Sequence, residues 1–281
     1  MNLQNTNQNI TQNNLKKNLQ NTLQDILGKN YKWLYISYFH FKGQLYYTKG
    51  TLAYLLATLI QLSVALITFY VLGKENKNDF ISYIWFANFY SILAPLWLQE
   101  ELCEKIRRGG LSKFLMYPTS VFWYNIFDFI GRGVLASSWI LLIPNIVLLP
   151  FLYNNFNFNL SFVNIFSLVL MYPAMYLIKF CGQWLVSMLT FWIVDTGGSN
   201  MSYDLLITFL GGFNLPLFLL PVWVSWTPFA FIGHYPATIF LGKENNPLSL
   251  VLISYTVALG MYLLSQYIYK LGLKKYEAIG L

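Results

Sequence analysis

Long runs without a charged residue place the strongest constraint on how this chain can fold. Five such runs contain 22, 19, 46, 38 and 25 residues and are, in order, Thr51–Leu72, Phe80–Leu98, Gly133–Ile178, Leu205–Gly242 and Asn245–Tyr269. A helix needs about 20 mostly apolar residues to cross the roughly 30 Å hydrocarbon core of a bilayer, so several of these runs are long enough to span it. Charged residues make up 10% of the whole chain, whereas soluble domains contain about 25%. The sequence therefore predicts an all-α polytopic membrane protein.

Six transmembrane helices are predicted from these runs and from the polar segments between them. The expected spans are about 51–72, 80–98, 133–153, 161–194, 203–222 and 248–270. The fourth span has 34 residues, which is more than one perpendicular crossing needs. This stretch is expected to tilt, to break near Pro173 or to project beyond the bilayer.

The N-terminal part of the chain has no run long enough to span. Residues 1–30 are predicted to form a disordered cytoplasmic tail, because the first 24 positions contain eight Asn and five Gln. Residues 31–50 mix aromatic side chains with three lysines, which predicts an amphipathic elbow helix at the membrane interface. Residues 31–281 are expected to form a single transmembrane domain.

The segment between the fifth and sixth spans is both apolar and rich in proline. Pro216–Lys243 contains four prolines, and it has no Asp, Glu, Lys or Arg before Lys243. It is too broken for one straight helix and too apolar for a solvated loop. Because backbone polar groups at membrane depth must be satisfied internally, the segment predicts short re-entrant helices that enter from the outer face.

The distribution of Lys and Arg predicts the orientation of the chain. With the N-terminus in the cytoplasm, the cytoplasmic side carries 13 of these residues and the outer side three. Cytoplasmic loops carry an excess of Lys and Arg, and six spans return the C-terminus to the cytoplasm as well. The net charge of +7 is thus explained by topology and by contact with anionic lipid, without nucleic acid. The 13 residues are Lys16, Lys17, Lys29, Lys32, Lys42, Lys49, Lys105, Arg107, Arg108, Lys113, Lys270, Lys274 and Lys275, and the three are Lys74, Lys77 and Lys243.

The sequence contains no recognisable set of catalytic or metal-binding residues. It has no G-x-x-x-x-G-K-[ST] motif for ATP. His40 and His234 fall on opposite sides of the predicted membrane, and Cys103 and Cys181 provide no metal-ligand spacing. No nucleophile with a base and an orienting group is present either. We therefore expect no catalytic, cofactor or metal site in this chain.

Three charged residues lie at or within the predicted membrane region. Asp128 and Arg132 are four positions apart with the acid first, which is the favourable order for a helical ion pair. Lys179 is the one charged residue in the long fourth span. It is either a lysine that snorkels to the interface, a lysine paired across a subunit contact, or a residue of a translocation pathway.

The densest cluster of charge follows the second span, in the segment EKIRRGGLSKFLMYPTS at Glu104–Ser120. Any cytoplasmic loop is basic because that charge orients the chain, but this rule does not explain the acids that precede Arg107 and Arg108. It also does not explain the Gly109-Gly110 pair, which lets the chain turn, or Pro118, which ends a helix. The pattern predicts a shaped segment that docks a cytoplasmic partner through its charges.

This segment also carries a resemblance to a known family. It is similar to the I-R-x-G-x-L…L-x-x-P-x-S sequence that follows the second span in permease subunits of ABC transporters of the type-2 exporter class. A second similarity runs from Phe191-Trp192 through Gly212–Pro216 to PFAFIGHYPATIFLGK. Together they cover roughly residues 31–281, and they resemble the six-span half-permeases often described as multidrug exporters. The positions that match the first pattern are Ile106, Arg107, Gly109, Leu111, Leu115, Pro118 and Ser120.

The resemblance implies both an architecture and a set of partners. It implies six spans with an N-terminal elbow helix, a cytoplasmic coupling helix between spans two and three, and outer re-entrant helices, in the inner or plasma membrane of the cell. It also implies a complex of two half-permeases, from the same or a related chain, with two ATPase subunits that bind ATP and magnesium. The residues implied in ATPase coupling are Glu101, Glu104, Arg107, Arg108, Gly109, Lys113 and Pro118.

Two other functions remain as alternatives. A secondary transporter driven by an ion gradient needs carboxylates within the membrane, and most of the predicted spans have none. Transport that survives ATP depletion but stops with an uncoupler would favour this alternative. A membrane-embedded transferase needs a cluster of acids or histidines at one membrane face, and transfer of lipid or sugar by the purified chain alone would favour it.

Overall fold

The computed structural model describes most of the chain outside its N-terminal region. The described residues are 33–43, 77–94, 98–116, 120–137, 160–193 and 197–276, with isolated positions in 52–67 and 142–147. Within them every regular element is a helix, which agrees with the predicted all-α class. The predicted tail at 1–30 lies outside the described residues, as do most of the predicted spans 51–72 and 133–153, whose described positions are helical.

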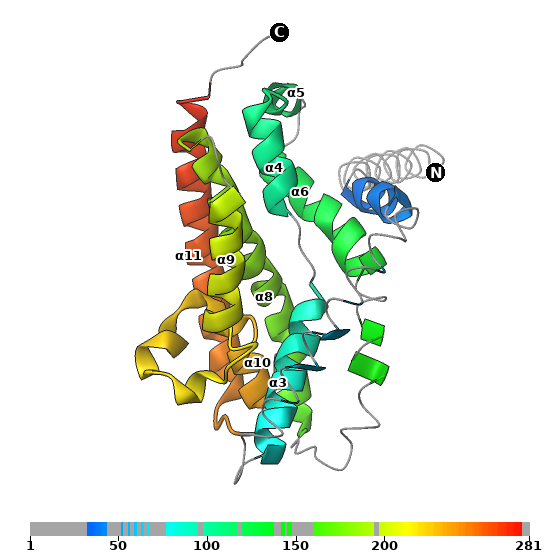
Figure 1. Cartoon of the computed structure of the whole chain (residues 1–281), viewed down its shortest axis with the longest axis vertical. Coiled ribbons are helices and arrows are strands. Elements are labelled where there is room, and N and C mark those ends of the chain that lie inside the picture. Colours follow the sequence, from blue (N-terminus) through cyan, green and yellow to red (C-terminus); the bar gives the residue numbers. More distant parts are fainter. Residues whose placement is uncertain are drawn as a thin grey trace, which may run out of the picture.

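Two long parallel helices form the centre of the molecule. Helix α8, Phe162–Met188, continues through a 3₁₀ turn at Leu189–Phe191, and helix α11 is Pro247–Leu273. They lie side by side along their length (Figure 1). In the part of the chain that the structure describes, these two helices are long and apolar enough to cross a membrane. Helix α8 continues through Pro173, so the long fourth segment does not break there.

The helix within the predicted second span, 80–98, ends before the span does. Helix α3, Lys77–Ile92, ends in a turn at 93–94, and helix α4, Leu98–Arg107, begins four residues later. The sequence has a proline at position 95, which cannot donate the backbone hydrogen bond that a continuous helix requires. Figure 1 shows α4 continuing toward the end of the molecule at which α11 ends.

A change of helix type follows the docking region. Helix α6, Val121–Phe129, continues directly into a π-helical segment at Ile130–Ser137. The helix that leads toward the predicted third span thus begins at Val121, twelve residues before the predicted start at Gly133. Short π segments inside helices often mark functional positions, because they shift which carbonyl groups the backbone satisfies.

The helix at the predicted fifth span, 203–222, also ends earlier than predicted. Helix α9, Gly197–Leu210, ends just before Gly212, whose φ of 79° favours glycine. Short helical segments then follow up to α11, as the four prolines indicated. These are three 3₁₀ segments, Leu217–Leu219, Val222–Trp226 and Pro228–Phe231, and helix α10, His234–Phe240.

Helix α10 is fastened to α3 by polar and aromatic contacts. The Tyr83 hydroxyl is hydrogen-bonded to Nδ1 of His234 at 2.8 Å. The rings of Phe86 and Phe240 stack with their centroids 4.1 Å apart. These contacts hold the short helical segments against α3. Tyr83 is thus a structural partner for His234 within the chain.

Candidate functional site

The structure gives the predicted docking region a defined shape. We call residues 98–116 the docking segment: helix α4, a turn, and the short helix α5, Leu111–Leu115. Helix α4 is amphipathic, with Leu102, Cys103 and Ile106 buried on the side that packs against α8. Glu104 and Arg107 of the same helix are exposed, so the described part of α4 buries an apolar face within the chain and leaves these two charges at the surface.

A tight turn joins the two helices of the docking segment. Gly109 has a φ of 72°, in the left-handed region that L side chains rarely adopt. The Ser112 hydroxyl donates to the Gly109 carbonyl at 2.7 Å, and the Arg108 N–H donates to the Glu104 carbonyl at 3.0 Å. The turn is therefore a defined structure, and Gly109 is the residue that permits it.

Three of the four charged groups whose side chains the structure describes in this segment are exposed. Arg108 and Glu104 form an ion pair at 2.9 Å, with 79% and 51% of their side chains exposed. Such exposed pairs contribute little to stability, so both groups remain available to a partner. Arg107 is exposed as well, and the Lys105 ammonium lies 4.9 Å from the centre of the Phe114 ring.

The remaining predicted docking residues lie partly outside the described structure. The backbones of Glu101 and Lys113 lie in α4 and α5, and their side chains lie outside the described part. Pro118 lies outside the described residues. The described structure thus brings Glu104, Arg107, Arg108 and Gly109 together at one end of the molecule.

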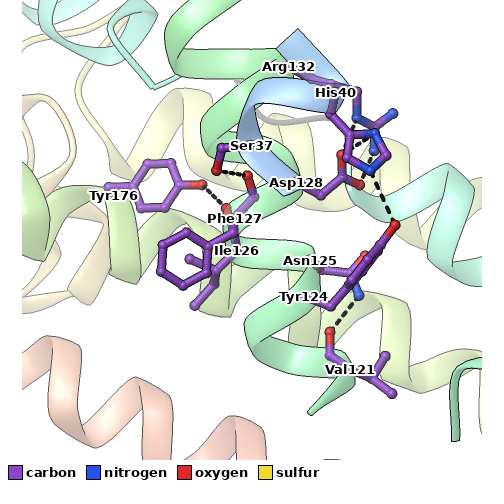
Figure 2. Close-up of polar contacts among 10 residues, drawn as sticks. All are labelled: Ser37, His40, Val121, Tyr124, Asn125, Ile126, Phe127, Asp128, Arg132 and Tyr176. Carbon is purple, nitrogen blue, oxygen red and sulfur yellow. Dashed lines mark hydrogen bonds and ion pairs between the residues drawn. The ribbon is translucent and has the colours of Figure 1, made fainter. Parts of the chain in front are cut away.

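Aromatic and histidine side chains connect the docking segment to the helix at 33–43, which we call the elbow helix. Phe114 of α5 packs against Tyr124 of α6, with ring centroids 5.5 Å apart. The Tyr124 hydroxyl is hydrogen-bonded to Nε2 of His40 on the elbow helix at 3.2 Å (Figure 2). The elbow helix and the docking segment therefore share Tyr124 as a common neighbour.

The predicted Asp128–Arg132 ion pair is confirmed and has a third member. Arg132 donates to the two Asp128 carboxylate oxygens at 2.8 and 2.6 Å. Nδ1 of His40 lies 3.0 Å from the same carboxylate, and the Asp128 side chain is only 2% exposed (Figure 2). An ionised carboxylate only accepts hydrogen bonds, so Nδ1 carries the proton and, in the neutral ring, Nε2 accepts from Tyr124.

Two hydroxyl groups satisfy backbone carbonyls just before the π-helical segment. The Ser37 hydroxyl donates to the Phe127 carbonyl at 2.6 Å, and the Tyr176 hydroxyl donates to the Ile126 carbonyl at 3.1 Å (Figure 2). Ser37 comes from the elbow helix and Tyr176 from α8. Side chains from two other elements thus bond to the helix where its own hydrogen-bond pattern changes.

Sequence reasoning did not identify the roles of Ser37 and His40. The two residues are three positions apart, so they lie on one face of the elbow helix, where they contact α6. Leu34, Tyr35, Tyr38 and Phe39 are exposed. The helical spacing of Ser37 and His40 within a mostly aromatic segment is the sequence feature from which this contact could have been predicted.

Lys179 is held by the end of α3. Its ammonium donates to the Ser91 carbonyl and hydroxyl, both at 3.1 Å, and to the Ala94 carbonyl at 2.9 Å. The last carbonyls of a helix have no partner within the helix, and the helix dipole favours a cation there. The ammonium is therefore partly buried within the chain and caps α3 where that helix stops short.

We expect Lys179→Met to destabilise the protein. The substitution leaves carbonyl groups at the end of α3 without this donor, and an unsatisfied buried acceptor costs about 1–3 kcal/mol. The measurement is the thermal unfolding of the detergent-solubilised chain. Lys270→Met is the matched control, since Lys270 is exposed in the last turn of α11. Unchanged stability with lost transport would instead support the pathway role for Lys179.

Metal-ligating side chains do not gather in the described part of the chain. Across those residues, no group of three or more His, Cys, Asp or Glu side chains lies close enough to hold a metal ion.

Comparison with known protein families identifies the family of this chain. The model of a family described as ABC-2 family transporter proteins matches residues 52–280, which is most of the chain. No curated protein matches the chain, and no solved structure matches it. The matched range includes the whole docking segment and both long helices.

Proposed function

Because this chain belongs to the ABC-2 family of transporter proteins, we propose that it is the permease subunit of an ATP-driven exporter. The family places the chain in a membrane as a component of a transport system. In the proposed complex, two half-permeases, from the same or a related chain, form the translocation pathway. Two separate ATPase subunits bind ATP and magnesium and drive transport.

The proposed topology follows the charge distribution. The chain has six spans, both termini lie in the cytoplasm, and the membrane is the inner or plasma membrane of the cell. The docking segment and the C-terminal end of α11 then lie on the cytoplasmic side, and the short segments between α9 and α11 lie on the outer side as re-entrant helices. This arrangement agrees with Figure 1, where these two groups of segments lie toward opposite ends of the molecule.

The observation that carries this proposal is the construction of the docking segment. Its apolar face is buried against α8, while Glu104, Arg107 and Arg108 are exposed beside a turn fixed by Gly109. A chain without an ATP-binding motif needs an external source of energy, and this segment offers a partner a rigid, charged surface. Charges at such a surface guide a partner into register.

The contacts of the segment provide a route for coupling. When ATP binding closes the two ATPase subunits, the docking segment moves with them. Its packing passes that motion to α8 through α4, and to α6 and the elbow helix through Phe114 and Tyr124. Packed side chains transmit displacement because interiors have low compressibility.

We expect Arg107→Glu combined with Arg108→Glu to abolish binding of the ATPase subunit. Reversing two exposed charges places like charges opposite the partner, which costs several kcal/mol. The measurement starts with affinity purification of the tagged chain from native membranes and identification of a co-purifying subunit that hydrolyses ATP. The double variant is then compared with the wild type at equal amounts of inserted permease.

Lys270→Glu is the control for a charge reversal outside the docking segment. Lys270 is exposed in the last turn of α11, and its substitution should leave ATPase binding in place. Normal co-purification of the ATPase with the Arg107/Arg108 variant would contradict the docking role. Absence of any ATP-hydrolysing subunit with the wild-type chain would contradict the proposed function itself.

A further inference from the structure

The residues that directly follow α11 contact the docking segment. The Tyr276 hydroxyl accepts a hydrogen bond from the backbone N–H of Ser112, at the start of α5, at 3.2 Å. The two residues are 164 positions apart in the sequence. The first N–H groups of a helix lack partners within that helix, so a phenol oxygen at this place supplies one of them. Figure 1 shows α5 and the end of α11 at the same end of the molecule.

Tyr276 is also held from its other side. Its ring packs edge-to-face on Phe191, with centroids 5.9 Å apart and an interplanar angle of 86°. Phe191 in turn lies so close to Gly272 of α11 that a Cβ at this glycine would collide with its ring. Tyr276 therefore links three elements at the cytoplasmic end: α5, the 3₁₀ turn after α8, and α11.

This contact places two pairs of basic residues at the same end of the molecule. Lys274 and Lys275 directly precede Tyr276, and both are exposed. Arg107 and Arg108 precede the turn that leads to Ser112, and they are exposed too. Because Tyr276 is bonded to Ser112, the lysine pair lies beside the docking segment.

We propose that Lys274 and Lys275 form a second part of the ATPase-docking surface, and that Tyr276 positions this part relative to α5. The inference rests on the proposed function and extends its docking surface to the end of the chain's last helix. The partner surface it fits is an acidic patch on the ATPase subunit, since opposite charges steer association and fix register.

The mixed charge of the region favours a protein partner over a lipid surface. Glu104 is exposed and paired with Arg108 in the same docking segment. An anionic headgroup layer would repel this carboxylate, whereas a folded partner can place a cation opposite Glu104 and anions opposite the basic pairs. The two parts of the surface come from opposite halves of the sequence. A partner bound to both parts would therefore contact α4 and the end of α11 together.

The experiment measures binding of the ATPase subunit to the permease in nanodiscs. The probe is the ATP-hydrolysing subunit that co-purifies with the wild-type chain, isolated and returned at known concentrations. Lys274→Glu with Lys275→Glu is expected to weaken its binding at least about tenfold. The loss should shrink as salt rises, because exposed charges are screened over about 10 Å at 0.1 M ionic strength. Lys270→Glu, in the last turn of α11 just before the two lysines, is the control and should bind like the wild type.

Tyr276→Phe tests the positioning role. The phenylalanine keeps the ring that packs on Phe191 and removes the oxygen that accepts from Ser112. We expect the thermal unfolding temperature to stay unchanged while ATPase affinity and the stimulation of ATP hydrolysis both fall. A purely structural role would change the unfolding temperature and leave the affinity of the folded protein unaltered, which would overturn the positioning claim.

Two results would overturn the second docking surface. One is equal ATPase binding by the lysine double variant and the wild type. The other is a defect seen only in nanodiscs that contain phosphatidylglycerol and absent in purely zwitterionic lipid, which would assign the lysines to lipid headgroups. Both differ from failure of the proposed function, in which the wild-type chain itself binds no ATPase.

Discussion

Replacing Asp128 with alanine is expected to lower the free energy of unfolding by about 3–5 kcal/mol. The Asp128 side chain is 2% exposed and accepts from Arg132, whose side chain is 19% exposed. Its removal takes away the carboxylate that a largely buried guanidinium and the His40 ring both contact. Breaking a buried pair from one side is costly for this reason. The measurement is thermal unfolding of the solubilised protein, together with its yield in the membrane fraction.

The chain contains a matched control for this substitution. Glu104 and Arg108 have the same spacing and the same order as Asp128 and Arg132, but they are exposed. Glu104→Ala should therefore change stability by less than about 1 kcal/mol. Equal losses from the two alanine variants would show that burial of the Asp128 cluster does not control its contribution.

A methyl group at Gly131 is expected to displace the elbow helix. A Cβ at this position would collide with the Ser37 carbonyl oxygen and lie 2.8 and 2.9 Å from the Ser37 carbonyl carbon and Cα. These are backbone atoms, so no side-chain rotation can relieve the contact, and the elbow helix must move. The movement would weaken the bond from Ser37 to the Phe127 carbonyl and the contacts of His40. Overpacking of this kind costs typically 1–3 kcal/mol.

The Gly131→Ala variant should show two measurable changes. Its thermal unfolding temperature should fall, and trypsin should cleave after Lys42 faster than in the wild type, because the elbow helix is released. Gly260→Ala is the control: Gly260 lies within α11 and a Cβ there would have no atom within 4 Å. Alanine is favoured over glycine within a helix, so this control should be neutral or slightly stabilising. Wild-type cleavage of the Gly131 variant would contradict a tight contact between elbow and α6.

The sequence allowed the long helices and the local polar contacts to be predicted. The runs at 161–194 and 248–270 correspond to α8 and α11, because sustained apolar composition is a local property. The Asp128–Arg132 pair could be predicted for the same reason, since its members lie one turn apart.

The helix ends were less predictable. The second span was predicted from an uncharged run that includes Pro95, and the prediction gave that run more weight than the proline. In the structure α3 ends at Ile92, three residues before Pro95. The predicted fifth span likewise passed through Gly212 and Pro216, whereas α9 ends at Leu210. In both places backbone restrictions determined the helix end, and counting charges does not detect them.

The contacts that connect distant segments were not visible in the sequence. His40 meets Tyr124 across 84 positions, and Ser112 meets Tyr276 across 164. Lys179 was the most ambiguous residue for the same reason, because its partners at Ser91 and Ala94 are 88 and 85 positions away. A residue's neighbours across the fold depend on how the helices pack, and one sequence does not specify that packing.

The length of α8 has a consequence for where a motor protein would act. With its 3₁₀ turn it has 30 residues, so at 1.5 Å per residue it is about 45 Å long. Tilted by the average of about 20°, it still rises about 42 Å, which equals the thickness of a bilayer including its headgroups, about 40–45 Å. Since α4 packs against the end of this helix, a bound ATPase would stand at the aqueous edge of the headgroup layer. The ATPase subunit proposed above would then contact the permease without entering the headgroup layer.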